Sequence, residues 1–133
     1  MSTEQPLVLI ADDEPDVVLV TKTRLEVNGF RVVVAYDGEQ ALARFRTEKP
    51  DILLLDLKMP KLDGYQVCRI LKSDPATRHI PIIIFSASSS HSLVLENLCL
   101  GLGADDYIRK PFTADELLAK VLRQLTNPAP DCP

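Results

Sequence analysis

The sequence predicts an α/β protein in which five strands form a doubly wound parallel sheet. Short aliphatic runs alternate five times with segments of helical periodicity, which is the pattern of repeated βαβ units. Most of these runs are almost wholly apolar, as strands covered by helices on both faces should be. With 133 residues, 46% of them hydrophobic, the chain is long enough for one domain with its own core.

The first strand is expected at Leu7–Ala11 and is followed by a helix over Asp16–Val27. This helix begins after Pro15, because proline is favoured in a first helical turn. It ends at Asn28-Gly29, a pair that tolerates the left-handed backbone found after helices.

The second strand, Arg31–Ala35, is followed by a helix over Gly38–Thr47, and the third, Ile52–Leu55, by a helix over Gly64–Ser73. Apolar residues recur at helical spacing in both helices. The fourth strand is Ile82–Phe85.

The shorter fifth strand, Tyr107–Arg109, precedes the clearest helix of the chain. Residues 113–116 form a capping box, and apolar residues follow at helical intervals: Leu117, Leu118, Val121, Leu122 and Leu125. Three prolines then lie within the last seven residues, too many for a helix to continue. We therefore expect a flexible N-terminus over 1–6, a folded domain over 7–126 and a proline-rich tail or linker over 127–133.

Composition excludes several classes of protein. A net charge of −4 offers no basic field for nucleic acid, so this domain is not expected to bind it directly. No apolar run reaches the roughly 18 residues that span a bilayer, and no signal peptide begins the chain. We expect a cytoplasmic protein without membrane contact. The three cysteines, Cys68, Cys99 and Cys132, fit neither a disulfide framework nor a metal motif.

Five reactive side chains follow the expected strands directly. Two carboxylates come after the first strand, a third after the third strand, a hydroxyl after the fourth and an ammonium after the fifth: Asp12, Asp13, Asp56, Ser86 and Lys110. Singly, each has an ordinary explanation as a helix cap, a turn residue or a solvated charge. Together they would meet at one edge of a parallel sheet, where ligands bind.

Three clustered carboxylates repel one another, so the cluster favours a hard divalent cation, for which Mg²⁺ is the obvious choice. With Mg²⁺ bound, Asp56 can attack phosphorus while Lys110 offsets charge on the phosphoryl oxygens. Ser86 can donate a hydrogen bond to the product.

These residues resemble the receiver family of two-component signalling. The motifs that carry the resemblance are Asp12-Asp13-Glu14, residues 56–64, Ser86-Ala87, residues 103–107 and Lys110-Pro111-Phe112. The resemblance covers about residues 7–126 and implies a flavodoxin-like fold with strand order 2-1-3-4-5, an order for which the chemotaxis member of this family is a standard example.

The resemblance also implies a role for each matching residue. Asp56 would be the phosphoacceptor, and Mg²⁺ would be held by Asp13, Asp56 and the Lys58 backbone carbonyl, with Asp12 acting through water. Ser86 and Lys110 would hold the phosphoryl oxygens, while Ser86 and Tyr107 would move together on activation. The Lys110–Pro111 peptide is a candidate for the cis isomer.

The resemblance further implies a signalling switch and not an ordinary enzyme, although it would promote its own phosphorylation and dephosphorylation. A sensor histidine kinase or a histidine phosphotransfer protein would supply the phosphoryl group. The surface of the fourth helix, fifth strand and fifth helix would then control a partner or an output domain. The segment 93–102 is apolar on more than one face, which fits either a homodimer surface or deeper burial.

The spacing from Ser86 to Lys110 is two residues longer than is usual in the family, and the surplus is expected in a loop over Ser88–Ser92. Three other classes of protein fit the sequence less well. An aspartyl phosphatase would carry a second acid where Lys58 stands, and a flavodoxin-like cofactor carrier would not place Asp12 and Asp13 beside a phosphate. A receiver used only for protein contacts would have little reason to keep a complete acidic site.

Overall fold

Strands and helices alternate strictly in the computed structural model, which describes residues 5–87 and 90–126. The strands are β1 (Leu7–Ala11), β2 (Arg31–Ala35), β3 (Ile52–Asp56), β4 (Ile82–Ala87) and β5 (Asp106–Lys110). The helices are α1 (Pro15–Val27), α2 (Gly38–Glu48), α3 (Gly64–Ser73), α4 (Ser90–Leu102) and α5 (Ala114–Thr126). All strand pairs are parallel, and the order β2-β1-β3-β4-β5 confirms the expected topology.

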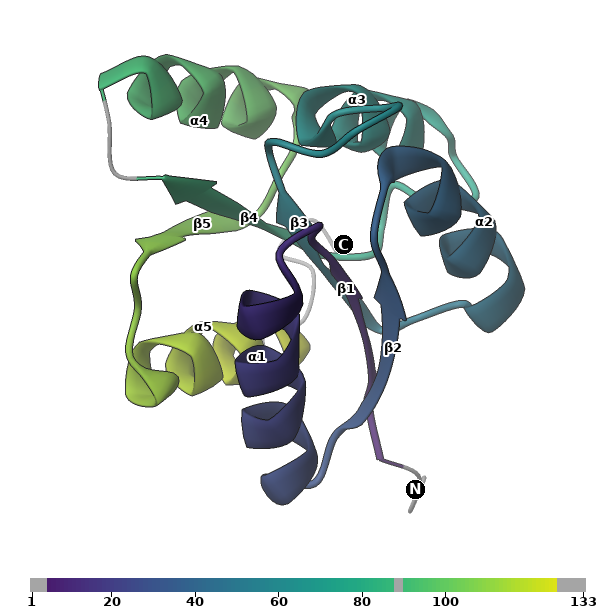
Figure 1. Cartoon of the computed structure of the whole chain (residues 1–133). Helices are drawn as coiled ribbons and strands as arrows, with labels where there is room; N and C mark the ends of the chain where they lie inside the picture. Colours follow the sequence, from purple (N-terminus) through teal and green to yellow (C-terminus); the bar gives the residue numbers. More distant parts are fainter. Residues whose placement is uncertain (1–4, 88–89, 127–133) are drawn as a thin grey trace.

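Helices cover both faces of this sheet (Figure 1), with α1 and α5 on one face and α2, α3 and α4 on the other. Successive side chains of a strand point to opposite faces. In β1, Val8 and Ile10 therefore pack with residues of α1 and α5, whereas Leu9 and Ala11 pack with residues of α2 and α3. This double burial explains why the strands are apolar without alternation.

The strand ends differ slightly from the expected ones. β3, β4 and β5 extend to Asp56, Ala87 and Lys110, so the reactive residues Asp56, Ser86 and Lys110 belong to the last turns of their strands. The parallel ladder continues to these positions, with Asp56 aligned to Phe85 and Ala87 to Lys110. The sequence predicts shorter strands because polar side chains at these positions ordinarily indicate the end of a buried strand.

Helix ends follow the sequence signals at several places. Asn28 ends α1 and Gly29 takes a φ of 92°, while Pro15 occupies the first turn. At α5, Glu116 N donates to Thr113 Oγ1 at 3.1 Å and Thr113 N donates to Glu116 Oε1 at 3.1 Å, so the capping box is present. Among the five apolar residues expected on this helix, Leu117 and Val121 are buried but Leu122 is exposed.

The expected loop over Ser88–Ser92 is partly wrong, because α4 begins at Ser90 and takes up the last three of these residues. Residues 88–89 lie outside the described residues, as do 1–4 and 127–133, which hold most of the expected flexible N-terminus and all of the expected tail. Cys68 and Cys99 are free and buried between α3, α4 and the sheet. Over the described residues, we find no helix with the length and apolar character needed to cross a membrane.

Candidate functional site

The carboxyl ends of β1, β3 and β5 bring an acidic cluster and one lysine together. Asp12 follows β1, Asp56 ends β3, and Lys110 ends β5. Because β1 and β3 are neighbours in the sheet, Asp12 and Asp56 lie side by side, and Lys110 reaches them from beyond β4. The sheet topology therefore assembles residues that are far apart in sequence.

Lys110 contacts three carboxylates. Its Nζ lies 2.8 Å from Asp12 Oδ2, 2.8 Å from Glu14 Oε1 and 3.5 Å from Asp56 Oδ2. Only about a sixth of the Lys110 side chain is exposed, whereas Glu14 is more than half exposed. The ammonium is thus a shared counter-ion for the whole cluster. The Lys110–Pro111 peptide bond that follows it is cis.

Asp12 is the most deeply buried member of the cluster, with 0% of its surface exposed. Its Oδ1 accepts a hydrogen bond from Glu14 N at 3.0 Å. Its Oδ2 has Lys110 nearby but accepts no hydrogen bond of good geometry. A buried carboxylate oxygen in this state is energetically unfavourable, so the position suits a cation.

Asp56 is also buried, and its charge is poorly compensated. Burial, followed by repulsion from Asp12, raises its pKa to about 7, although Lys110 and the Lys58 backbone N–H favour the ionised form. Burial opposes the charge of Lys110, but contacts with Asp12 and Glu14 outweigh it and raise the pKa of the ammonium above its ordinary value. The lysine therefore stays charged, whereas the aspartate has a pKa close to neutral pH.

Three carboxylates meet the geometric condition for a metal site. One oxygen each from Asp12, Asp13 and Asp56 lies within 4.8 Å of the others, and Asp13 is exposed at the mouth of the cluster. An all-oxygen set of this kind suits Mg²⁺, which binds through one or two carboxylates and keeps several waters. The burial of Asp12, whose Oδ2 has the Lys110 ammonium 2.8 Å away but accepts no hydrogen bond of good geometry, is consistent with this fit.

The loop after Asp56 folds back over β3 and depends on a glycine. Gly64 N donates to Leu57 O at 2.9 Å, and a Cβ at Gly64 would collide with the carbonyl oxygen of Asp56. Asp63 caps α3, because its Oδ1 accepts a hydrogen bond from Gln66 N. In return, the Gln66 side-chain oxygen Oε1 accepts a hydrogen bond from Asp63 N. This loop carries Lys58, whose N–H donates to Asp56 Oδ1 at 3.4 Å.

Ser86 and Tyr107 lie on the neighbouring strands β4 and β5. Ser86 is 1% exposed near the end of β4. Tyr107, in β5, is half-buried against the core, and the cationic ends of Arg109 and Lys120 each lie 5.5 Å from the centre of its ring. The structure thus places Ser86 near the carboxyl edge of the sheet and Tyr107 further from this edge, level with Ile84 of β4.

A largely apolar groove of about 540 Å³ adjoins Lys110, between α1 and the start of the β5–α5 connection. Its lining comprises Glu14, Asp16, Val17, Val20, Thr21, Lys110, Pro111 and Phe112. Thr21 is 1% exposed and its hydroxyl has no hydrogen-bond partner. Val20 is exposed on this side of α1, whereas exposed Leu19 lines a separate hollow against β2.

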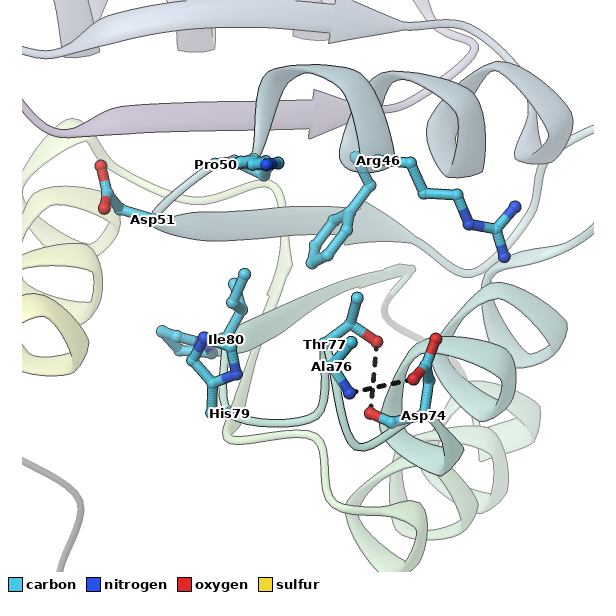
Figure 2. A pocket seen from close by; sticks show the side chains of 11 residues that line it. Arg46, Pro50, Asp51, Asp74, Ala76, Thr77, His79 and Ile80 are labelled. Atoms are coloured by element: carbon cyan, nitrogen blue, oxygen red, sulfur yellow. Dashed lines mark hydrogen bonds between the residues drawn. The ribbon is translucent and has the colours of Figure 1, made fainter.

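A second hollow, of about 730 Å³, lies at the opposite edge of the sheet (Figure 2). Residues that precede β3 and β4, such as Asp51 and Ile80, line it together with the end of α2. Its two carboxylates already accept backbone hydrogen bonds, from Leu7 N to Asp51 and from Ala76 N to Asp74. Ligands of parallel α/β sheets bind at the carboxyl edge, so this hollow is not the reactive site.

Sequence reasoning gave no individual role to two residues that shape the site. Glu14 holds Lys110, and Gly64 allows the loop to approach Asp56. Both belong to motifs recognised in the sequence, but a contact across the sheet and a close backbone approach are visible only in three dimensions.

Comparison with known proteins gives one consistent result. The family model described as the response regulator receiver domain matches residues 8–122. Over 132 residues, the chain is 42% identical to the transcriptional regulator ycf27 of Cyanophora paradoxa, an alignment that covers 96% of this chain and 53% of that protein. It is 41% identical over 114 residues to the alkaline phosphatase synthesis transcriptional regulatory protein PhoP of Bacillus subtilis, covering 86% and 46%.

Comparison with solved structures indicates the same family. A crystal structure of a response regulator from Chloroflexus aurantiacus matches with a TM-score of 0.86 and 31% identity, covering 92% of this chain and 98% of that one. The chain therefore spans about half the length of the curated relatives it matches but nearly all of this solved chain.

Proposed function

Because this chain belongs to the response regulator receiver domain family, we propose that Asp56 accepts a phosphoryl group and that the domain signals through the change that follows. The family acts as a signalling switch in two-component systems and not as a conventional enzyme. The observation that carries the proposal is the pocket in which Asp56, with a raised pKa, lies between two further aspartates and Lys110.

In the proposed reaction an oxygen of Asp56 attacks the phosphorus of a phosphohistidine. A P–O bond forms while the P–N bond breaks, and the ring nitrogen leaves with the electron pair. Lys110, only 3.5 Å from Asp56, offsets charge on the phosphoryl oxygens. Ser86 donates a hydrogen bond to the aspartyl phosphate.

The cofactor is proposed to be Mg²⁺, held by Asp12, Asp13, Asp56 and the backbone carbonyl of Lys58, with Asp12 acting through water. Bound there, the cation supplies positive charge that offsets the carboxylates and the transferred phosphoryl group. The support is the clustering of the three carboxylates within 4.8 Å and the burial of two of them, Asp12 and Asp56.

The donor is proposed to be a sensor histidine kinase or a histidine phosphotransfer protein in the cytoplasm. The groove between α1 and Phe112 suits its docking, because the groove is mostly apolar and opens beside Lys110. A helix that presents the phosphohistidine can bury its apolar face there, together with exposed Val20 of α1. Docking at this position brings the donor next to Asp56.

The output is proposed to pass through α4, β5 and α5, with Ser86 and Tyr107 as the residues that move. The surface of α4 supports this because Val94, Leu98 and Leu100 are exposed, and the same surface suits a homodimer. Both relatives named above are described as transcriptional regulators, and this chain covers about half of each. We infer an output at transcription through a separate DNA-binding part.

Phosphorylation by a small donor tests the proposal. Purified protein is incubated with phosphoramidate, with Mg²⁺ or with EDTA, and its intact mass is measured. We expect the mass of one phosphoryl group, gained only with Mg²⁺. A protein that stays unmodified and also fails to bind beryllofluoride would indicate a domain that serves only protein contacts.

A further inference from the structure

The ammonium of Lys110 faces three acidic partners that play different parts, and Asp12 Oδ2 is the first of them, at 2.8 Å. Asp56 is the proposed phosphoacceptor, yet its Oδ2 lies 3.5 Å from Lys110 Nζ, whereas Glu14 Oε1 lies at 2.8 Å. Glu14 does not belong to the set of carboxylates that could hold a metal ion. In the unphosphorylated domain, the two closer contacts are therefore made to Asp12 and Glu14, and of these two only Glu14 lies outside the proposed metal site.

Backbone geometry allows Glu14 to make this contact. Glu14 is the N-cap residue of α1, but its side chain makes no capping hydrogen bond to the helix. It extends instead to Lys110, which donates to Oε1 at 2.8 Å. An N-cap side chain ordinarily accepts a hydrogen bond from a backbone N–H of the first helical turn, whereas the Glu14 carboxylate accepts one from Lys110.

We propose that Glu14 is a positioning residue that holds Lys110 back from Asp56 and competes with the phosphoryl group for the ammonium. This inference rests on the proposed function. When a cation neutralises Asp12 and Asp56, Glu14 remains as the protein carboxylate opposite Lys110. Phosphorylation must then draw the lysine from Glu14, so the pair restrains activation.

The expected effect is modest because Glu14 is more than half exposed. Ion pairs with one exposed partner are weak, which corresponds to a change of about two- to fivefold in an affinity. Beryllofluoride, which mimics the phosphoryl group on Asp56, provides a suitable probe.

The experiment compares wild type with Glu14→Gln, Glu14→Asp and Glu26→Gln, by NMR titration with beryllofluoride at saturating Mg²⁺. Glu14→Gln removes the charge. Glu14→Asp keeps the charge, but the shorter side chain lies within reach of the helix N–H groups instead of Lys110. Glu26→Gln, an exposed change at the other end of α1, is the control.

We expect both Glu14 variants to bind beryllofluoride about two- to fivefold more tightly than wild type, and Glu26→Gln to match wild type. In the metal-free protein, the side-chain ammonium protons of Lys110 should exchange faster in both Glu14 variants. Unchanged affinity in Glu14→Asp would overturn the inference, because charge alone would then explain Glu14→Gln. If wild type binds no beryllofluoride, the proposed function itself fails, and this inference fails with it.

Discussion

Lys110, at the end of β5, reaches across β4 to within 3.5 Å of Asp56, at the end of β3. Neither residue is placed by a local motif, since the parallel sheet alone brings them to the same edge. The charge of Lys110 partly offsets the unfavourable burial of Asp56, whose pKa is nevertheless raised to about 7. Stability and reactivity are therefore linked at one contact.

Asp56→Asn should stabilise the metal-free protein, and more so at high pH. The pKa of Asp56 is about 7 in the folded state against the ordinary aspartate value of 3.8, so its ionisation disfavours folding increasingly as pH rises from about 4 to 7. At pH 8 the full penalty is present, and the gain from Asn should reach up to about 4 kcal/mol. Urea unfolding in EDTA at pH 8 and pH 5 measures this gain as the difference in unfolding free energy between Asp56→Asn and wild type.

Asp115→Asn, on the exposed first turn of α5, serves as the control for Asp56→Asn. It should change the unfolding free energy far less at either pH. A gain from Asp56→Asn that is equal at pH 5 and pH 8 would contradict the assigned burial penalty.

Lys110→Met should destabilise the protein in EDTA by about 1–3 kcal/mol, because Asp12 and Asp56 are buried and would lose their shared counter-ion. Excess Mg²⁺ should restore part of this loss. Lys61→Met removes two ion pairs, to buried Asp37 and to exposed Glu39, and should cost at most about 1 kcal/mol because the Lys61 side chain is itself more than half exposed. Equal losses for the two variants in thermal or urea unfolding would show that Lys110 is only a surface charge.

Gly64→Ala should destabilise the fold by about 1–3 kcal/mol and slow phosphorylation. The new Cβ would meet the carbonyl oxygen of Asp56 and push the loop away from β3. Gly101→Ala is the matched control, since a Cβ there has open space within α4 and alanine favours helix. Urea unfolding that gives the same result for both variants would refute the close approach at Gly64.

Asp13→Asn should weaken Mg²⁺ binding at least tenfold, because one of only three clustered carboxylates loses its charge. Its own effect on stability in EDTA should be small, since Asp13 is exposed. The increase in melting temperature on adding Mg²⁺ measures the affinity through linkage, with Glu26→Gln as control. A shift as large as that of wild type would exclude Asp13 as a ligand.

The fold was predictable because its signals are redundant. Buried strands such as Ile52–Leu55, helix signals such as the capping box at Thr113 and five repeats of the same alternation all favour one architecture. The convergence of Asp12, Asp56 and Lys110 followed from the rule that parallel strands share one carboxyl edge.

Other features were beyond sequence reasoning for physical reasons. Strand ends depend on backbone ladders, so β4 continues through Ser86 despite its polar side chain. The start of α4 at Ser90 was missed because serine runs ordinarily indicate loops. The pairing of Glu14 with Lys110 depends on side-chain geometry between elements that are distant in sequence.

The most direct test of the account is to locate the phosphoryl group. Protein treated with phosphoramidate and Mg²⁺ is reduced with borohydride, which converts an aspartyl phosphate to homoserine, and then digested for mass spectrometry. We predict homoserine at position 56 in wild type and none in Asp56→Asn. Homoserine at Asp12 or Asp13 instead, or phosphate on a serine or histidine, would contradict it.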